Sequence, residues 1–335
     1  MPLPPSLLDG PRVASVTHVL GLDGGATKTV AVMLDLSTYE VAYGRAGPSN
    51  ADAVGEQNTL VALRTAVGRA LEAAGVPSDR AGAVLAIAGT RTPDFEGVIR
   101  SSFGFETLHV VNDVVAAWAL GTVCSPGMAV IAGTGSHVFG VDGAGRSWRT
   151  GGWGHDLGDE GSGYWLGLEG LKAALRYRDG SGPPTTLLDA ALEEYRLGAI
   201  EELQSLFYGK PLTKAEVAAF TPSVAAAAED GDEVARALFE QGGRELACQA
   251  RAVVEALELG AEPLTIGLIG SVFQAGPLIR PTLERSVLEF APGARFSVPE
   301  LPPVAGSLML AIHSVGAWRD FDYDRLAAAL SDGQG

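Results

Sequence analysis

The chain has 335 residues, a length that suggests about two domains. Hydrophobic residues make up 47% and charged residues 19%, a composition typical of globular proteins and not of disordered ones. Forty acidic against 24 basic residues give a net charge of −16, which argues against general binding to nucleic acid or anionic membranes. Cys124 and Cys248 are too few for a disulfide framework, and we expect two buried thiols in a reducing cytosol.

The first sixteen residues, MPLPPSLLDGPRVASV, are rich in proline and predict a loose tail. They contain no basic segment ahead of an apolar run, so they do not resemble a secretory signal. No uninterrupted apolar stretch reaches about 18 residues, so we expect no membrane span and a cytoplasmic protein.

The first part of the chain predicts a mixed α/β unit. Two apolar runs joined by a Gly-Gly-Ala turn indicate a β-hairpin, and leucines at helical spacing that end before Gly75 indicate a helix. The expected order is βββαβαβ, over residues 18–23, 29–34, 41–44, 56–75, 83–88, 93–101 and 108–111.

The pattern restarts about 110 residues later and forms a weak internal repeat. Strands are expected at 128–132, 138–141 and 146–149, a mostly helical region at 161–260, a strand at 264–269, a helix from there to 288, and helices at 306–318 and 322–330. The longest helical segment, 231–258, is expected to be interrupted at Gly242-Gly243. We predict one domain from 1–120 plus 305–335 and a second from 121–304.

The turn DGGATK between the first two strands could bind phosphate. Gly24 and Gly25 let backbone N–H groups approach phosphate oxygens, Thr27 adds a hydroxyl and Lys28 adds a positive charge. Asp23, at the strand end, could position Mg²⁺ through water. The alternative is an ordinary hairpin turn with a solvated lysine.

A second glycine turn, Gly133-Thr134-Gly135-Ser136, again lies between two strands. It is not a dinucleotide fingerprint, because Val138 stands in place of the third glycine and a strand pattern follows. We expect it to wrap phosphates as the first turn does, although each turn alone is compatible with a plain hairpin.

Asp113 follows an apolar strand and precedes a helical segment. A carboxylate at such a strand end suits a base that takes a hydroxyl proton during phosphoryl transfer. The alternative is that Asp113 is the N-cap of the helix.

The stretch GGWGHDLGDEGSGYWLGLE suits a carbohydrate site, because carboxylates accept hydrogen bonds from sugar hydroxyls and a tryptophan can cover a pyranose face. The simpler alternatives are a core aromatic for Trp153, a first-turn helix carboxylate for Glu160 and a buried histidine for His155. His137 could line only the wall of the site. The turn at Gly270 and Ser271, between a strand and a helix, could accept an adenine or ribose.

These motifs together resemble the BadF/BadG-type ATPases and, more closely, the N-acetylglucosamine kinases of the actin/Hsp70/sugar-kinase superfamily. The resemblance runs from about 18 to 318 and rests on DGGATKT (23–29), GPSN (47–50), AIAG (86–89), ND (112–113), IAGTGS (131–136), GGWGHDLGDEGSGYW (151–165) and GLIGS (267–271). It implies an α/β fold of two ribonuclease H-like (actin-like ATPase) domains around a central cleft.

The resemblance also implies an ATP- and Mg²⁺-dependent kinase that phosphorylates an amino sugar, with N-acetylglucosamine at its 6-hydroxyl as the leading substrate. Asp113 would be the catalytic base. The sugar pocket would be lined by Asn50, Asp159 and the backbone of Gly152, Trp153 and Gly154, with Ser136 and His137 at its edge. Thr27 and Thr134 would hold phosphates, and Gly270 and Ala218 would lie near the nucleotide.

Glucosamine and N-acetylmuramic acid remain alternative substrates. A second alternative is an ATPase that couples nucleotide state to a protein partner. The activator branch with an iron–sulfur cluster is disfavoured, because it needs paired cysteines. Family members are often dimers, so a homodimer is one expected assembly.

Overall fold

The computed structural model describes residues 3–89, 94–209, 211–261, 263–276 and 278–332. The chain forms two compact units. Unit 1 comprises residues 1–127, 141–147 and 299–335, and unit 2 comprises residues 128–140 and 148–298.

Unit 1 contains a five-stranded mixed sheet in the order β3-β2-β1-β4-β5. The first three strands are an antiparallel meander, and β4 and β5 run parallel to β1. Their bounds are β1 His18–Gly24, β2 Thr29–Asp35, β3 Val41–Ala46, β4 Ala81–Ile87 and β5 Thr107–Asn112. Every residue of β4 is buried, which explains its continuous apolar sequence.

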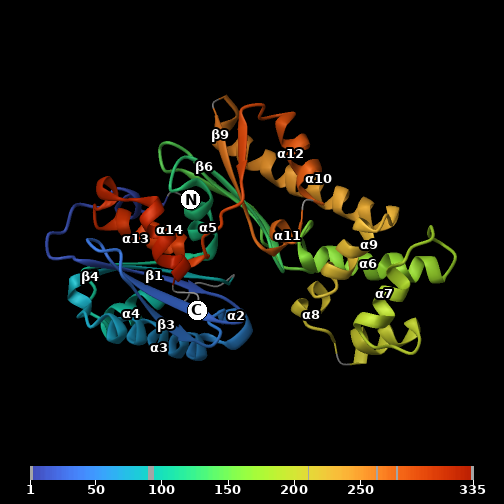
Figure 1. Ribbon diagram of the computed structural model, residues 1–335, viewed down its shortest axis with the longest axis horizontal. Helices are drawn as coiled ribbons and strands as arrows, with labels where there is room; N and C mark the ends of the chain where they lie inside the picture. The colour runs from blue at the N-terminus through green and yellow to red at the C-terminus, as the bar shows by residue number, and fades with distance from the viewer. Residues whose placement is uncertain (1–2, 90–93, 210, 262, 277, 333–335) are drawn as a thin grey trace. The chain divides into compact units, whose positions relative to one another are not determined.

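Helices cover the sheet of unit 1 (Figure 1). Helix α3 (Glu56–Ala74) packs on β3 and β2, and it buries Leu63, Val67 and Ala70 at helical spacing. Helix α13 (Val304–Ser314) packs on β1, β4 and α5 (Asp113–Thr122). The remaining helical elements are α2 (Ala51–Val54), η1 (Ser78–Arg80), α4 (Phe95–Ser102), η5 (Trp318–Asp320) and α14 (Tyr323–Asp332).

The prediction of a loose N-terminal tail is wrong for the residues that the structure describes. A short helix, α1 (Pro5–Leu8), packs on α13 and buries Leu7 completely. A ring nitrogen of His313, Nδ1, is 2.9 Å from the Leu8 carbonyl oxygen. Gly10 lies so close to Ser314 that no Cβ would fit there, so the absence of a side chain allows this docking.

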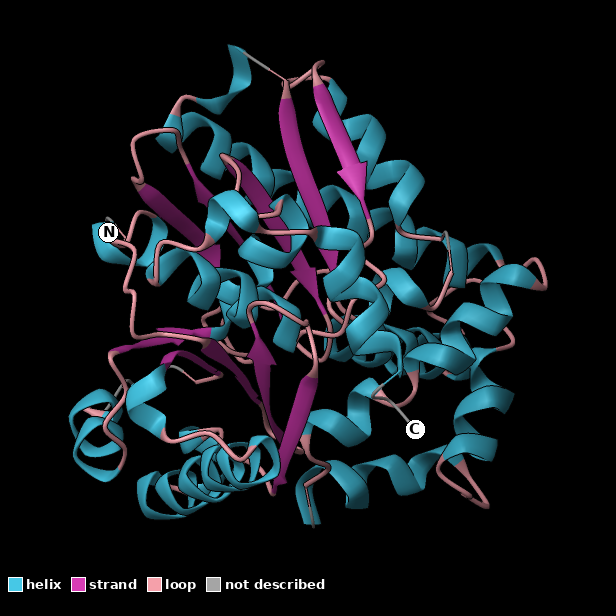
Figure 2. Cartoon of the chain, turned by 60° about the vertical axis from the view of Figure 1, so that its left-hand side comes forward, coloured by secondary structure: helices cyan, strands magenta, loops and turns pink. Residues whose placement is uncertain are grey.

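Unit 2 has a second five-stranded sheet in the order β10-β9-β6-β7-β8. Its strands are β6 Gly127–Ala132, β7 Ser136–Val141, β8 Ser147–Gly151, β9 Leu264–Ile269 and β10 Ala294–Ser297. The order repeats that of unit 1, so the predicted α/β class with two related sheets is confirmed (Figure 2). Strand β10 was missed, because its residues alternate between partly and fully exposed and form no apolar run.

The helical elements of unit 2 are α6 (Gly163–Arg178), α7 (Leu187–Glu194), η2 (Ile200–Glu202), η3 (Ser205–Gly209), α8 (Lys214–Ala218), α9 (Thr221–Glu229), α10 (Glu233–Leu257), η4 (Leu259–Ala261), α11 (Ser271–Gln274) and α12 (Arg280–Leu288). The single helix expected after β9 is therefore two helices, α11 and α12.

The predicted interruption of α10 is also wrong, because the helix continues through both glycines. A Cβ on Gly242 would lie 3.2 Å from the Gly161 Cα, and one on Gly243 would lie 2.8 Å from the Ile279 carbonyl oxygen. The two glycines thus let neighbouring backbone approach the helix closely, and packing offsets their low helix propensity.

Candidate functional site

The first glycine hairpin joins β1 to β2 in unit 1. The Gly25 N–H donates to the Lys28 carbonyl oxygen at 3.0 Å, and Thr27 and Lys28 are exposed at the tip. The Ser49 and Asn50 N–H groups donate to the Gly25 carbonyl oxygen at 2.9 and 3.2 Å. The fold therefore brings the GPSN segment against the hairpin, as a site built from both motifs requires.

Asp23 lies beside this hairpin near the end of β1. Burial raises the pKa of its carboxyl group above the ordinary value, and the charge of Lys28 lowers it by less. A nearby cation would offset the cost of that burial. The Asp23 carboxylate offers the oxygen ligands that Mg²⁺ prefers, and one carboxylate fits a Mg²⁺ that keeps most of its water. Among the described residues no group of three acidic, histidine or cysteine side chains could hold a metal ion.

Asp113 lies at the same edge of the sheet as Asp23. The register pairs Gly24 of β1 with Ile87 of β4, and Ile87 with Asn112 of β5. Two strand spacings separate β1 from β5, so the two strand ends are about 10 Å apart. The interpretation of Asp113 as an N-cap is wrong: Asn112 is the cap, its side chain accepting from the Val114 N–H at 3.3 Å, and Asp113 is the first helical residue.

The second glycine hairpin joins β6 to β7 in unit 2. The Gly133 N–H donates to the Gly135 carbonyl oxygen at 2.9 Å, and Thr134 is exposed. The start of α6 docks on it, because the Gly163 N–H donates to the Gly133 carbonyl oxygen at 2.8 Å.

Gly270, the residue before α11, lies against the same hairpin. Its φ is +114°, and a Cβ would lie 2.3 Å from the Ala132 carbonyl oxygen. Only glycine fits this conformation and this approach. The predicted nucleotide residues Gly270 and Ser271 are therefore next to the hairpin. Ala218 is also nearby, since its Cβ is 3.6 Å from the Cβ position at Gly163.

Asp159 is a buried residue that is hydrogen-bonded to the second hairpin. Its side chain is 3% exposed, Oδ1 accepts from the Ser136 N–H at 3.1 Å, and Oδ2 accepts from Lys214 Nζ at 2.6 Å. Its φ of +66° is uncommon for a residue other than glycine. Sequence reasoning found Asp159 but missed Lys214, which is 55 residues away and belongs to no motif.

The segment that follows β8 turns sharply. Gly151, Gly152 and Gly154 have φ values of +76°, +71° and +87°, and a Cβ on Gly152 would lie 3.5 Å from that of His137. Trp153 is 69% exposed, so the alternative of a core aromatic is wrong.

Two further alternatives for this segment are wrong. His155 is exposed and packs edge-on against Tyr164 with the ring centroids 4.8 Å apart, so it is not a buried histidine. Glu160 precedes Ser162, the N-cap of α6, so it is not a first-turn carboxylate of that helix.

His137 is neutral at pH 7. Burial lowers its pKa to about 4, and the charge of Arg149 acts in the same direction. Its Nε2 atom is buried and has no hydrogen-bond partner within the described part of the chain. A neutral imidazole donates a hydrogen bond from one ring nitrogen and accepts one at the other.

The expectation of two buried thiols is wrong for Cys248, which is exposed, while Cys124 is partly buried. In the part of the chain that the structure describes, every helix is too short or too polar to span a bilayer.

Comparison with known proteins places these features in a family. The BadF/BadG/BcrA/BcrD ATPase family profile matches residues 20–311, and the chain belongs to this family. An N-acetylmuramic acid/N-acetylglucosamine kinase of Clostridium acetobutylicum is 35% identical over 260 residues, which are 76% of this chain and 85% of that protein. An N-acetyl-D-glucosamine kinase of Dictyostelium discoideum is 28% identical and covers 88% of this chain and 98% of its own length.

A solved structure gives the same fold. It is a protein of Chromobacterium violaceum, provisionally named an N-acetylglucosamine kinase, with a TM-score of 0.71 and 25% identity over 89% of this chain and 99% of its own. The family resemblance read from the motifs is thus confirmed.

Proposed function

We propose that this protein is an ATP-dependent amino-sugar kinase that phosphorylates N-acetylglucosamine at its 6-hydroxyl. The observation that carries the proposal is the edge of the unit 1 sheet, where the glycine hairpin after β1 and the Asp113 carboxylate after β5 occur together. The names of the relatives support the substrate class, and they include N-acetylmuramic acid as a second substrate for the Clostridium protein.

In the proposed reaction Asp113 accepts the proton of the sugar hydroxyl while that oxygen attacks the γ-phosphate in line. Gly24 and Gly25 let the phosphates approach the hairpin backbone closely, and the Thr27 hydroxyl and the Lys28 ammonium stabilise the charge on the phosphates. Mg²⁺, held through water by Asp23, would neutralise further phosphate charge when bound.

A second group of proposed nucleotide contacts lies within unit 2. Gly133, Thr134 and Gly135 are proposed to contact phosphates through the hairpin, and Gly270 to lie by the adenosine. Ser271 and Ala218 are the remaining proposed nucleotide contacts. Their support is that all six residues gather around one hairpin and the starts of α6 and α11.

The proposed sugar contacts are Asn50, His137 and the backbone of residues 152–154. Ser136 and Asp159, which the resemblance also assigns to the sugar pocket, are buried and hydrogen-bonded to each other, so we propose that they support this site from within unit 2. Trp153 and Asn50 are accessible to solvent, whereas the carboxylate of Asp159 already accepts two hydrogen bonds and is 3% exposed. Neutral His137 fits a site for an uncharged sugar amide.

The test is an ADP-release assay with N-acetylglucosamine, N-acetylmuramic acid, glucosamine and glucose, each against a control with ATP alone. We expect ADP release to depend on an amino sugar and to be absent with 6-deoxy-N-acetylglucosamine. ADP release that no sugar changes would contradict the proposal and favour an ATPase coupled to a protein partner.

A further inference from the structure

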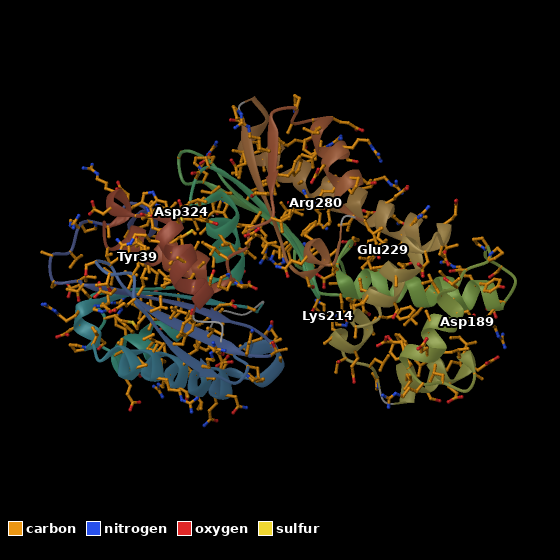
Figure 3. The ribbon with its side chains drawn as sticks, viewed as in Figure 1. Tyr39, Asp189, Lys214, Glu229, Arg280 and Asp324 are labelled. Atoms are coloured by element: carbon orange, nitrogen blue, oxygen red, sulfur yellow. The ribbon has the colours of Figure 1, made fainter. Side chains whose placement is uncertain are left out.

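Lys214 is a cation placed directly against the second glycine hairpin. It is the first residue of α8, and Figure 3 shows its side chain extending from that helix. A Cβ built on Gly135 would lie 2.7 Å from Lys214 Nζ, so the ammonium occupies the space that a side chain at position 135 would fill. Because Gly135 has no side chain, the Lys214 ammonium is able to lie directly against the hairpin backbone.

The position of this charge is fixed by Asp159. The Asp159 carboxylate joins the Lys214 ammonium, at 2.6 Å, to the Ser136 N–H, at 3.1 Å. Ser136 is fixed in turn, because its hydroxyl donates to the Glu160 carbonyl oxygen at 2.7 Å. The Asp159 side chain is 3% exposed and the Lys214 side chain 31% exposed. The buried carboxylate therefore holds the ammonium in place, and the lysine remains accessible to solvent.

Helix α8 is itself held in place at both ends. Thr213 and Glu216 form a capping box at its start, and Gly167 of α6 has no Cβ to clash with the Val217 carbonyl oxygen near its end. The lysine therefore lies on a supported element, and its ammonium does not depend on a mobile surface position.

We propose that Lys214 binds the phosphates of the nucleotide at the second hairpin and that Asp159 is its positioning residue. The inference rests on the proposed function only in placing a nucleotide at this hairpin. An ammonium with a carboxylate on one side still has N–H donors for a phosphate oxygen. Asp159 then acts on the nucleotide through Lys214 and Ser136.

The experiment measures binding of ATP, ADP and adenosine to the full chain by calorimetry with Mg²⁺ and without sugar. Lys214→Met should weaken ATP binding about 10- to 100-fold and leave adenosine binding unchanged, because only the phosphates meet the charge. Lys214→Arg should restore most of the ATP affinity. Lys172→Met is the matched control, because Lys172 pairs with Glu169 on α6 and is 46% exposed. This control variant should bind ATP as tightly as the unmodified chain does.

A purely structural lysine would only neutralise the buried Asp159. The comparison of Asp159→Asn with the double variant Asp159→Asn/Lys214→Met separates the two roles, because neither protein carries an unpaired buried carboxylate. The amide oxygen of Asp159→Asn still accepts a hydrogen bond and keeps the ammonium near the hairpin, so this variant should bind ATP less tightly than the unmodified chain but at least 10-fold more tightly than the double variant. Equal ATP affinity of these two proteins would overturn the proposal, as would an equal loss for adenosine. This pair also decides the matter if Lys214→Met alone fails to fold.

The two proposals fail separately. If the Lys214 variants lose ATP binding but the unmodified chain phosphorylates no sugar, the kinase function is overturned and the phosphate-binding role of Lys214 is supported. If the Lys214 variants bind ATP normally and the unmodified chain phosphorylates amino sugars, only the phosphate-binding role of Lys214 is overturned.

Discussion

The two glycine hairpins occupy equivalent places in their sheets, yet each obtains its charges differently. In unit 1 the hairpin sequence supplies both Asp23 and Lys28, a few residues apart. In unit 2 the residue before the glycine is Ala132, and the carboxylate and ammonium come from Asp159 and Lys214, 55 residues apart. The same combination of glycine turn, carboxylate and lysine is therefore local in one unit and tertiary in the other.

The edges of the two sheets differ as well. Strand β5 ends at Asn112 and leads into Asp113, whereas the equivalent strand β10 ends at Ser297 and leads into Val298. An apolar side chain cannot accept a proton, so of these two positions only residue 113 carries a side chain that could act as a base. The two sheets thus share one strand order and differ in the residues that follow their edge strands.

The contrast between the two sheet edges is tested most directly by Asp113→Asn. Loss of a general base should lower kcat about 10²- to 10⁴-fold, while binding of N-acetylglucosamine persists. Initial rates at saturating substrates and calorimetric sugar binding measure the two effects. Asp79→Asn, in η1 at the amino end of β4, is the control and should leave kcat unchanged. A near-normal rate for Asp113→Asn would remove that carboxylate from the chemistry.

Alanine at the two hairpins should sharpen the difference in how they are supported. A Cβ on Gly135 meets Lys214 Nζ at 2.7 Å and Asp159 Oδ1 at 3.0 Å, whereas one on Gly25 meets nothing closer than 3.7 Å. We expect Gly135→Ala to lower the free energy of unfolding by about 1–2 kcal/mol. Gly25→Ala should change it by less than about 0.5 kcal/mol. Urea unfolding measures the free energy of unfolding of both variants. Equal changes in the two variants would show that the Asp159–Lys214 pair does not stabilise the second hairpin.

The smallest effect is expected from the pH dependence of Asp23. Burial disfavours the charged carboxylate of Asp23 and so raises its pKa in the folded chain. The folded chain is therefore favoured at low pH, where Asp23 is protonated, and it loses that stability as the pH rises through the raised pKa. Asp23→Asn should therefore gain stability relative to the unmodified chain as the pH rises above the ordinary carboxyl pKa. Thermal unfolding at a series of pH values measures the gain, and a constant difference between the two proteins would contradict it.

Asp35→Asn provides a control of opposite sign in the same unit. Burial alone would raise the pKa of Asp35, but hydrogen bonds from Ser37 and Thr38 hold it below its ordinary value. That stabilisation is present at neutral pH and is lost on acidification, so Asp35→Asn should lose stability relative to the unmodified chain as the pH rises.

Local pattern was sufficient for much of the fold and for the motifs. Strand β9 was predicted with its observed bounds, and α3 was predicted to end before Gly75, whose φ of +66° terminates it. Apolar runs and helical periodicity are properties of neighbouring residues, so they can be read before any packing is known. The family was also evident, because its glycine turns and the GGWG–GDEGSGYW run are short contiguous strings.

Contacts between distant segments were decided only by the tertiary structure. The pairing of Asp159 with Lys214, the docking of Leu7 on α13 and the continuity of α10 through Gly242 each depend on what packs against a residue from elsewhere in the chain. No sequence pattern encodes such a neighbour directly, because burial and charge pairing arise only when remote elements meet. The sequence by itself therefore predicted which two turns bind phosphate, and tertiary packing decided which lysine lies beside the second turn.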